Sequence, residues 1–190
     1  MKDDATVNSG LPDPVQPEPS GARLISGFLS TAKAVLLSPR VFFAGMPLDG
    51  GLLGPYFFFF LCTVFFLLIS LVLNATALGT IEPWALLMVF LALWMPFVSA
   101  ALLFFILGRI QGTTGSYEAT FRVVCYASAV NLLAWVPIVG ILCQFYEVYL
   151  TTVGLSVVHR ISLGRALLAV IGAALTLFFA IFLAVQVIFT

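Results

Sequence analysis

Five polar side chains stand out because they lie inside long apolar runs: Glu118, Arg122, Tyr126, Gln144 and Glu147. Placing an ionisable group inside a bilayer costs about 2.5–3.5 kcal/mol, so such a group marks a candidate functional site. Glu118 and Arg122 form an i,i+4 pair with the acid first, which is the favourable order on a helix. We expect this pair to lie near a helix end, with Arg122 able to extend to the membrane surface. A shallow, neutralised pair is the structural alternative to a functional one.

Glu147 is harder to explain, because it lies near the middle of its apolar run. The residues at helical spacing around it are Gly140, Gln144, Glu147, Thr151 and Gly154. Small and polar residues at intervals of three and four are typical of a seam between membrane helices, so this face should point into the bundle. Within it, Glu147 could be neutral or could pair with Arg122, and its role could be functional or limited to structural hydrogen bonding.

Nothing in the sequence indicates catalysis. Ser156 and His159 are near neighbours, but no Gly-x-Ser-x-Gly elbow surrounds the serine. Glu118-x-x-x-Arg122 matches half of the Glu-Glu-x-x-x-Arg motif of CAAX-type intramembrane proteases, but Tyr117 replaces the first acid and the further histidines are absent. One histidine and three cysteines show no metal-ligand spacing. We therefore predict that the protein is not an enzyme and uses no metal or other cofactor.

The elements that position these residues must be membrane helices. The 190 residues are 62% hydrophobic and 8% charged, whereas soluble domains have about 45–50% and about 25%. Of the charged residues, six lie among the first 23 residues and only seven follow Gly50. This composition excludes a soluble enzyme, a disordered protein and a secreted disulfide scaffold. The net charge of zero gives no basic field for nucleic acid.

We predict an all-α, polytopic membrane protein whose domain, residues 52–190, is a bundle of five transmembrane helices. The apolar runs that are long enough to cross a bilayer lie at about residues 53–78, 83–107, 117–136, 139–158 and 165–189. The third and fourth runs are shorter and are separated only by Pro137 to Gly140. A re-entrant hairpin is the alternative for this pair, although lengths of about 20 residues favour full crossing.

The N-terminal part of the chain differs from the bundle. Residues 1–21 are rich in proline and are predicted to be a disordered cytoplasmic tail. Residues 22–51 combine an amphipathic helix, residues 22–37, with a Gly/Pro connector. A helix of about 16 residues is short for a span and suits the bilayer interface; packing against loops of the bundle is the alternative. Three basic residues are expected to contact the membrane surface: Arg23, Lys33 and Arg40.

The loop charges predict the orientation. Basic residues precede the first span, and others lie after the second span (Arg109) and after the fourth (Arg160 and Arg165), whereas the opposite loops carry none. The positive-inside rule then places the N-terminus in the cytoplasm and the C-terminus outside, in a multi-pass protein of the cell (inner) membrane.

The last span carries small residues at every fourth position: Gly172, Thr176, Ala180 and Ala184. Such a stripe permits close helix packing, either within the monomer or between copies. The expected partners are accordingly membrane lipids, other membrane proteins or a second copy of the chain, and not nucleic acid.

Residues 112–168 resemble the Yip1 domain family, in its bacterial branch. The landmarks are Gly115-Ser116-Tyr117-Glu118, Arg122 followed by Tyr126-Ala127-Ser128, Pro137 with Gly140, and Gly154-Leu155 before His159. The approach to the first span is also similar, through Ser38-Pro39-Arg40, Phe42-Phe43 and Met46-Pro47. The resemblance covers about residues 35–169. It implies a five-span protein with a cytoplasmic N-terminus and supplies no catalytic residues.

Eukaryotic members of that family act in vesicle traffic between the ER and the Golgi and contact Rab-type GTPases, a role that bacterial relatives cannot share directly. We therefore expect a non-enzymatic Yip1-like membrane protein that organises membrane or binds membrane protein partners. The alternative is a small transporter, channel or lipid-translocating protein that uses the polar seam around Glu147.

Overall fold

The computed structural model describes residues 24–78, 84–111 and 115–189, and every regular element in these ranges is helical. The helices are α1 (Leu24–Leu37), α2 (Pro39–Gly45), α3 (Leu53–Leu78), α4 (Trp84–Gln111), α5 (Tyr117–Ala127), the 3-10 helix η2 (Ser128–Val130), α6 (Asn131–Ala134), α7 (Pro137–Val158) and α8 (Leu163–Phe189). The all-α prediction is confirmed. The predicted disordered tail (residues 1–21) and Arg23 lie outside the described residues.

Four helices of the described ranges, α3, α4, α7 and α8, are long and apolar enough to cross a membrane. Each coincides with a predicted span to within a few residues. The multi-pass membrane character of the chain follows from these helices.

The third predicted span, residues 117–136, is not one continuous α-helix. It consists of α5, η2 and α6, and the backbone keeps right-handed helical angles across both junctions. The Ser128 hydroxyl donates a hydrogen bond to the Cys125 carbonyl oxygen at 2.7 Å. Side-chain bonds of this kind compete with the helical backbone pattern, and this one lies at the change from α5 to the 3-10 turn. A count of five continuous spanning helices is therefore not confirmed.

A tight turn at Trp135 and Val136 leads from α6 into α7. Pro137 occupies the start of α7, where its missing N–H is not needed. A Cβ on Gly140 would lie 2.5 Å from the carbonyl oxygen of Ala134, so only glycine permits this approach. The turn therefore brings the start of α7 against α6.

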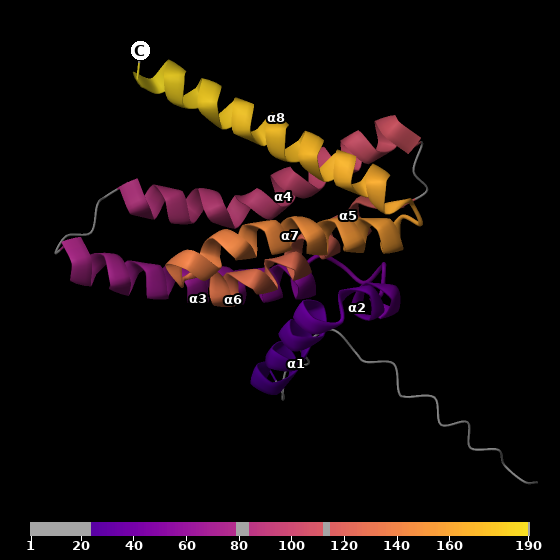
Figure 1. Ribbon diagram of the computed structural model, residues 1–190, viewed down its shortest axis with the longest axis horizontal. Coiled ribbons are helices and arrows are strands. Elements are labelled where there is room, and N and C mark those ends of the chain that lie inside the picture. Colours follow the sequence, from indigo (N-terminus) through magenta and orange to yellow (C-terminus); the bar gives the residue numbers. More distant parts are fainter. Residues whose placement is uncertain (1–23, 79–83, 112–114, 190) are drawn as a thin grey trace, which may run out of the picture.

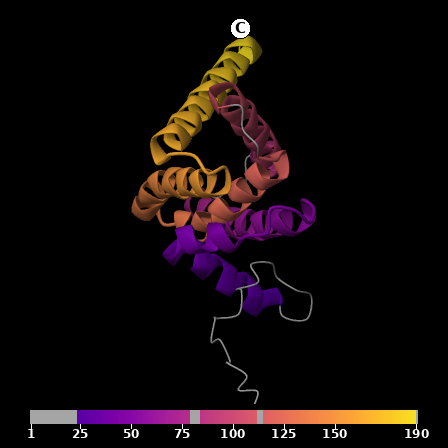
Figure 2. The same cartoon turned by 90° about the vertical axis from the view of Figure 1, so that its right-hand side faces the viewer.

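The helices are arranged in layers (Figures 1 and 2). Helix α8 packs against α4 and α7 on one side of the bundle, whereas α1 and α2 lie on the opposite side. Helix α5 contacts α3, α4 and α7 in the middle. Figure 1 shows α1 running across the direction of α3, α4 and α7.

Helix α2 was not predicted from the sequence. Helix α1 ends before Ser38-Pro39 as expected, but Pro39–Gly45 then form a second helix, and irregular backbone begins only at Met46. The helix forms because Phe42 and Phe43 are buried against the bundle. Gly154 of α7 makes room for Phe43, since a Cβ there would lie 3.1 Å from the Phe43 ring.

Candidate functional site

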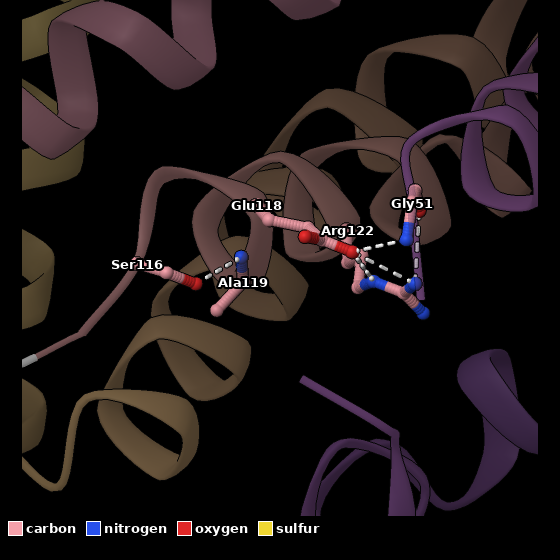
Figure 3. Close-up of polar contacts among 5 residues, drawn as sticks. All are labelled: Gly51, Ser116, Glu118, Ala119 and Arg122. Atoms are coloured by element: carbon pink, nitrogen blue, oxygen red, sulfur yellow. Dashed lines mark hydrogen bonds and ion pairs between the residues drawn. The ribbon is translucent and has the colours of Figure 1, made fainter. Parts of the chain in front are cut away.

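The start of α5 places two charged side chains on one helix face. The Ser116 side chain caps the helix by accepting a hydrogen bond from the Ala119 N–H at 3.1 Å (Figure 3). Glu118 lies in the first turn, where a negative charge interacts favourably with the helix dipole. Arg122 follows one turn later on the same face. The local sequence Ser116-Tyr117-Glu118 thus starts the helix and places Glu118 on the same face as Arg122.

Arg122 and Glu118 meet the backbone of Gly51, and we call these three residues the polar cluster (Figure 3). Arg122 Nη2 lies 3.1 Å from Glu118 Oε1 and donates to the Gly51 carbonyl oxygen at 2.9 Å. The Gly51 N–H donates to the same Glu118 Oε1 at 2.6 Å. The cluster therefore joins the connector after α2 to α5.

The burial of the polar cluster corrects one expectation. The pairing of Glu118 with Arg122 is confirmed, but the Arg122 side chain is 0% exposed and does not extend to the surface. The connector covers it and supplies a carbonyl acceptor in place of water. A buried charge of this kind persists only when it is paired and hydrogen-bonded.

Two adjacent glycines allow the connector to make these contacts. Gly50 and Gly51 have φ angles of 120° and 91°, which side chains rarely adopt. A Cβ on Gly50 would also lie 3.2 Å from Arg122 Nη2. The Gly50-Gly51 pair was visible in the sequence as part of a connector, but nothing local indicated its contact with a residue 71 positions away.

The other predicted site residues lie apart from the polar cluster. Tyr126 is buried among aromatic rings, with its ring centroid 5.1 Å from Phe42 and 5.2 Å from Phe58. Glu147 is half-buried, and within the described chain no hydrogen bond or ion pair joins it to Arg122. Gln144 is exposed. The structure therefore does not bring the two charged groups of α5 together with that of α7.

The predicted seam of α7 is buried over only part of its length. Thr151 and Gly154 are buried, and Gly140 lies against Ala134. Between them, Gln144 and Glu147 retain exposure. The seam therefore faces the bundle at both ends of α7 and borders open space near its middle.

His159 makes a contact that the sequence did not reveal. It is buried, and its Nε2 lies 2.9 Å from the Thr120 hydroxyl oxygen. Its ring packs against Gly115, where a Cβ would overlap the ring. Burial lowers the pKa of His159. Ser156 instead donates to the Ile161 carbonyl oxygen at 2.7 Å, so its hydroxyl is directed away from the histidine.

Helix α1 is packed on one side and exposed on the other. Thr31, Ala32 and Val35 are buried against the bundle. The Tyr146 hydroxyl donates to the Leu36 carbonyl oxygen at 2.5 Å. Packing against loops of the bundle was the alternative to an interfacial helix; α1 does pack on the bundle, but this contact is with helix α7 and not with a loop.

The opposite side of α1 and α2 is apolar, and we call it the outer face. Its members are each more than half exposed: Ile25, Leu29, Leu37 and Val41. Lys33 and Arg40 are exposed as well. The structure thus combines packing on the bundle with an amphipathic surface directed outward.

The small-residue stripe of α8 is not the face that packs within the chain. That face is formed by Ala166, Ala169, Val170 and Ala173. Of the stripe, Gly172 is half-buried, Thr176 and Ala180 are exposed, and the Ala184 side chain lies outside the described part. Contact between copies through this stripe stays a prediction.

Comparison with protein-family models gives a match to the Yip1 domain over residues 33–185. The match begins in the last part of α1 and reaches into the second half of α8, so it includes the polar cluster and His159. It extends further at both ends than residues 35–169. No curated protein and no solved structure matches the chain.

Proposed function

We propose a function for this chain from its membership of the Yip1 domain family. It is a non-enzymatic multi-pass protein of the family's bacterial branch. It organises the lipid of the cell (inner) membrane around its α1–α2 unit and offers the same unit to other membrane proteins. The observation that carries this proposal is the outer face of α1 and α2.

The outer face favours contact with lipid over water. Exposed apolar surface is unfavourable in water by about 25 cal/mol per Å², and four large aliphatic side chains lie on this face. Lys33 and Arg40 are exposed beside them. Each adds about 1 kcal/mol of attraction to an anionic leaflet when it lies near the surface. An amphipathic helix inserted in this way occupies area in one leaflet.

The attachment of α1 and α2 to the bundle supports the proposal further. The polar cluster joins the connector to α5 by hydrogen bonds, and Phe42 and Phe43 pack against α7. The Tyr146 hydroxyl also donates a hydrogen bond to the Leu36 carbonyl oxygen. A helix that is fixed in this way keeps its position relative to the spanning helices. Its effect on the leaflet is then localised around each copy of the protein.

The position of the arginines supports a cytoplasmic N-terminus and an external C-terminus. The end of α4 and the α7–α8 connection lie toward the right-hand end of the bundle in Figure 1, as does α2, whereas α8 ends on the left. By their positions in the sequence, Arg109 belongs to the last turn of α4 and Arg160 to the α7–α8 connection. Reporter fusions at the two ends of the chain test this arrangement. Reporters on opposite sides of the membrane agree with it, and reporters on the same side contradict it.

The membrane-organising role is tested with the full chain reconstituted in liposomes that contain anionic lipid. Lipid order is read with an environment-sensitive fluorescent probe, and vesicle shape by electron microscopy. We expect the wild type to disorder the leaflet and the double variant Leu29→Gln, Leu37→Gln to lose most of this effect. Ser30→Gln is the matched control, because it changes an exposed polar position of the same helix.

Two results would count against this role: no effect of the wild type on lipid order or shape, or an equal effect of the double variant. Loss of effect in Ser30→Gln as well would also count against it, because the apolar side chains would then not be the cause.

A second candidate function is a small transporter, channel or lipid-translocating protein. It is supported by Glu147, which is half-buried in a helix long enough to span and makes no hydrogen bond or ion pair with any other described residue. A flux assay in liposomes with Glu147→Gln tests this candidate. An active wild type with an inactive variant supports transport, and unchanged flux assigns a structural role to the residue.

A further inference from the structure

A cavity of about 470 Å³ lies between α3, α4, α6 and α7. Its wall is mostly apolar and includes Phe59 and Leu67 of α3, Met95 of α4 and Ile141 of α7. Volumes of about 300–1,000 Å³ are usual for sites that hold small molecules. The cavity is separate from the polar cluster, which shares no residue with its lining.

The cavity exists because the interrupted third segment is short. Helix α6 spans only Asn131–Ala134 and contributes no buried residue. The chain then turns back, with Gly140 close against Ala134. Figure 1 shows α3 and α4 extending beyond this turn. The space that a longer helix would occupy between α3, α4 and α7 is left open.

Three uncharged polar side chains line the cavity: Thr63, Asn131 and Gln144. The Thr63 residue is only 5% exposed, and its hydroxyl has no hydrogen-bond partner among the described residues. Leaving such a group unsatisfied costs about 1–3 kcal/mol. Asn131 and Gln144 likewise make no side-chain hydrogen bond to the described chain. The cavity therefore offers hydroxyl and amide groups that a ligand can satisfy.

The chemistry of the lining selects a neutral ligand. None of the described residues that line the cavity is Lys, Arg, His, Asp or Glu, so among them a phosphate group would be desolvated without a counter-charge. Hydroxyl and amide groups bond well to ester carbonyls and to alcohols. Met95 and Ile141 at the wall are exposed on the sides of helices that are long enough to span, so the opening faces lipid.

We infer that this cavity binds the glycerol and ester groups of an uncharged lipid of the diacylglycerol class, with the acyl chains extending into the bilayer. This site is independent of the effect of α1 and α2 on the leaflet, and either can fail without the other.

The test uses the full chain in phosphatidylcholine liposomes that contain a photoactivatable diacylglycerol. A parallel sample contains a photoactivatable phosphatidic acid with the same acyl chains. After illumination and digestion, mass spectrometry locates the labelled peptides. We expect diacylglycerol to label the segments of α3, α4 and α7 that line the cavity roughly tenfold more than phosphatidic acid does, because the charged headgroup has no partner there.

Two independent variants remove the site. Asn131→Leu with Gln144→Leu deletes the amides, and Ala92→Phe fills the cavity from α4. Each is expected to reduce the labelling roughly tenfold. The first variant removes one or two hydrogen bonds to the ligand, and the second removes the space that the ligand occupies. Ala101→Phe is the control, because Ala101 is exposed on the same helix and does not line the cavity.

The inference is overturned if the two probes label equally, if label spreads evenly over the exposed helix faces, or if both variants are labelled as strongly as Ala101→Phe. Thermal unfolding of each purified variant shows whether it is folded. A variant that does not fold is replaced by Ala92→Leu, which fills the same space with a smaller side chain.

Discussion

The two ends of the bundle are packed differently, and the third segment shows the change within a few residues. Helix α5 has eight buried residues, whereas α6 has none. Helix α8 repeats the contrast, since its buried residues end at Ala173 and none of the later described side chains is buried. We call the region around α2, α5 and the α7–α8 connection the packed end, and the region around α6 and the second half of α8 the open end.

The two ends also differ in how their polar groups are paired. At the packed end, the polar cluster is internally paired and His159 Nε2 bonds to Thr120, whereas His159 Nδ1 has no partner among the described residues. At the open end, Asn131 and Gln144 line a cavity without protein partners among the described residues. The charged groups of the polar cluster thus stabilise the fold at the packed end, and the amides of Asn131 and Gln144 remain available to a ligand at the open end.

Removing the charge of Glu118 gives the largest expected difference between the two ends. Glu118→Gln removes the carboxylate that pairs with the fully buried Arg122 charge. Breaking a buried pair in this way costs about 3–5 kcal/mol, and the partial exposure of Glu118 (27%) places the expected loss in free energy of unfolding at about 3 kcal/mol or less. Unfolding by SDS in mixed micelles measures it.

Glu147→Gln is the matched control for this prediction, because it neutralises an acid toward the open end that has no partner in the described chain. We expect its free energy of unfolding to change by less than about 0.5 kcal/mol. Equal losses from the two variants would show that the packed end does not depend on the polar cluster.

Two glycines test the packing itself. A Cβ on Gly154 would lie 2.5 Å from Val123 Cγ1, so Gly154→Ala should destabilise the protein by about 1–3 kcal/mol through overpacking. A Cβ on Gly172 of α8 has its nearest neighbour, Ile106, at 3.9 Å. Gly172→Ala should therefore be neutral or stabilising by up to about 1 kcal/mol, since alanine favours the helix. The melting temperatures of both variants measure this, and equal shifts would refute the contrast.

The smallest expected effect is a dependence of stability on pH at the packed end. Burial lowers the pKa of His159, so the folded state favours the neutral ring. In the unfolded state the histidine pKa is about 6.5, so this state binds more protons at pH values between the lowered pKa and about 6.5. Stability should therefore be fully present above about pH 6.5 and decrease as the pH falls through that window.

His159→Gln isolates this effect, because it removes the titration and keeps a polar side chain at the contact with Thr120. Its melting temperature, measured at several pH values in the same detergent, should lack the decrease that the wild type shows below neutrality. An identical pH profile in the two proteins would assign the dependence to other groups.

Two kinds of feature could be predicted from the sequence. Apolar length alone located α3, α4, α7 and α8, because lipid requires long, internally hydrogen-bonded helices. The pairing of Glu118 with Arg122 was predicted because it is local, one helical turn apart. Both predictions depend only on neighbours along the chain.

What could not be predicted depends on contacts between distant segments. The cover over Arg122 comes from Gly51, and the partner of His159 is Thr120, 39 positions away. Helix α2 forms because Phe42 and Phe43 are buried, not because its seven residues have a strong helical pattern. The 3-10 turn of the third segment coincides with a hydrogen bond from the Ser128 hydroxyl, and no periodicity in the sequence indicates it.

The central claim is that α1 is fixed to the bundle with its outer face in lipid. Spin labels at Leu29→Cys and Leu37→Cys, in a background in which Cys62, Cys125 and Cys143 are alanine, test it most directly in liposomes. We predict that both labels are accessible to oxygen and protected from a water-soluble nickel reagent, as expected for lipid contact. Labels that the nickel reagent reaches freely would place the outer face in water and contradict the claim.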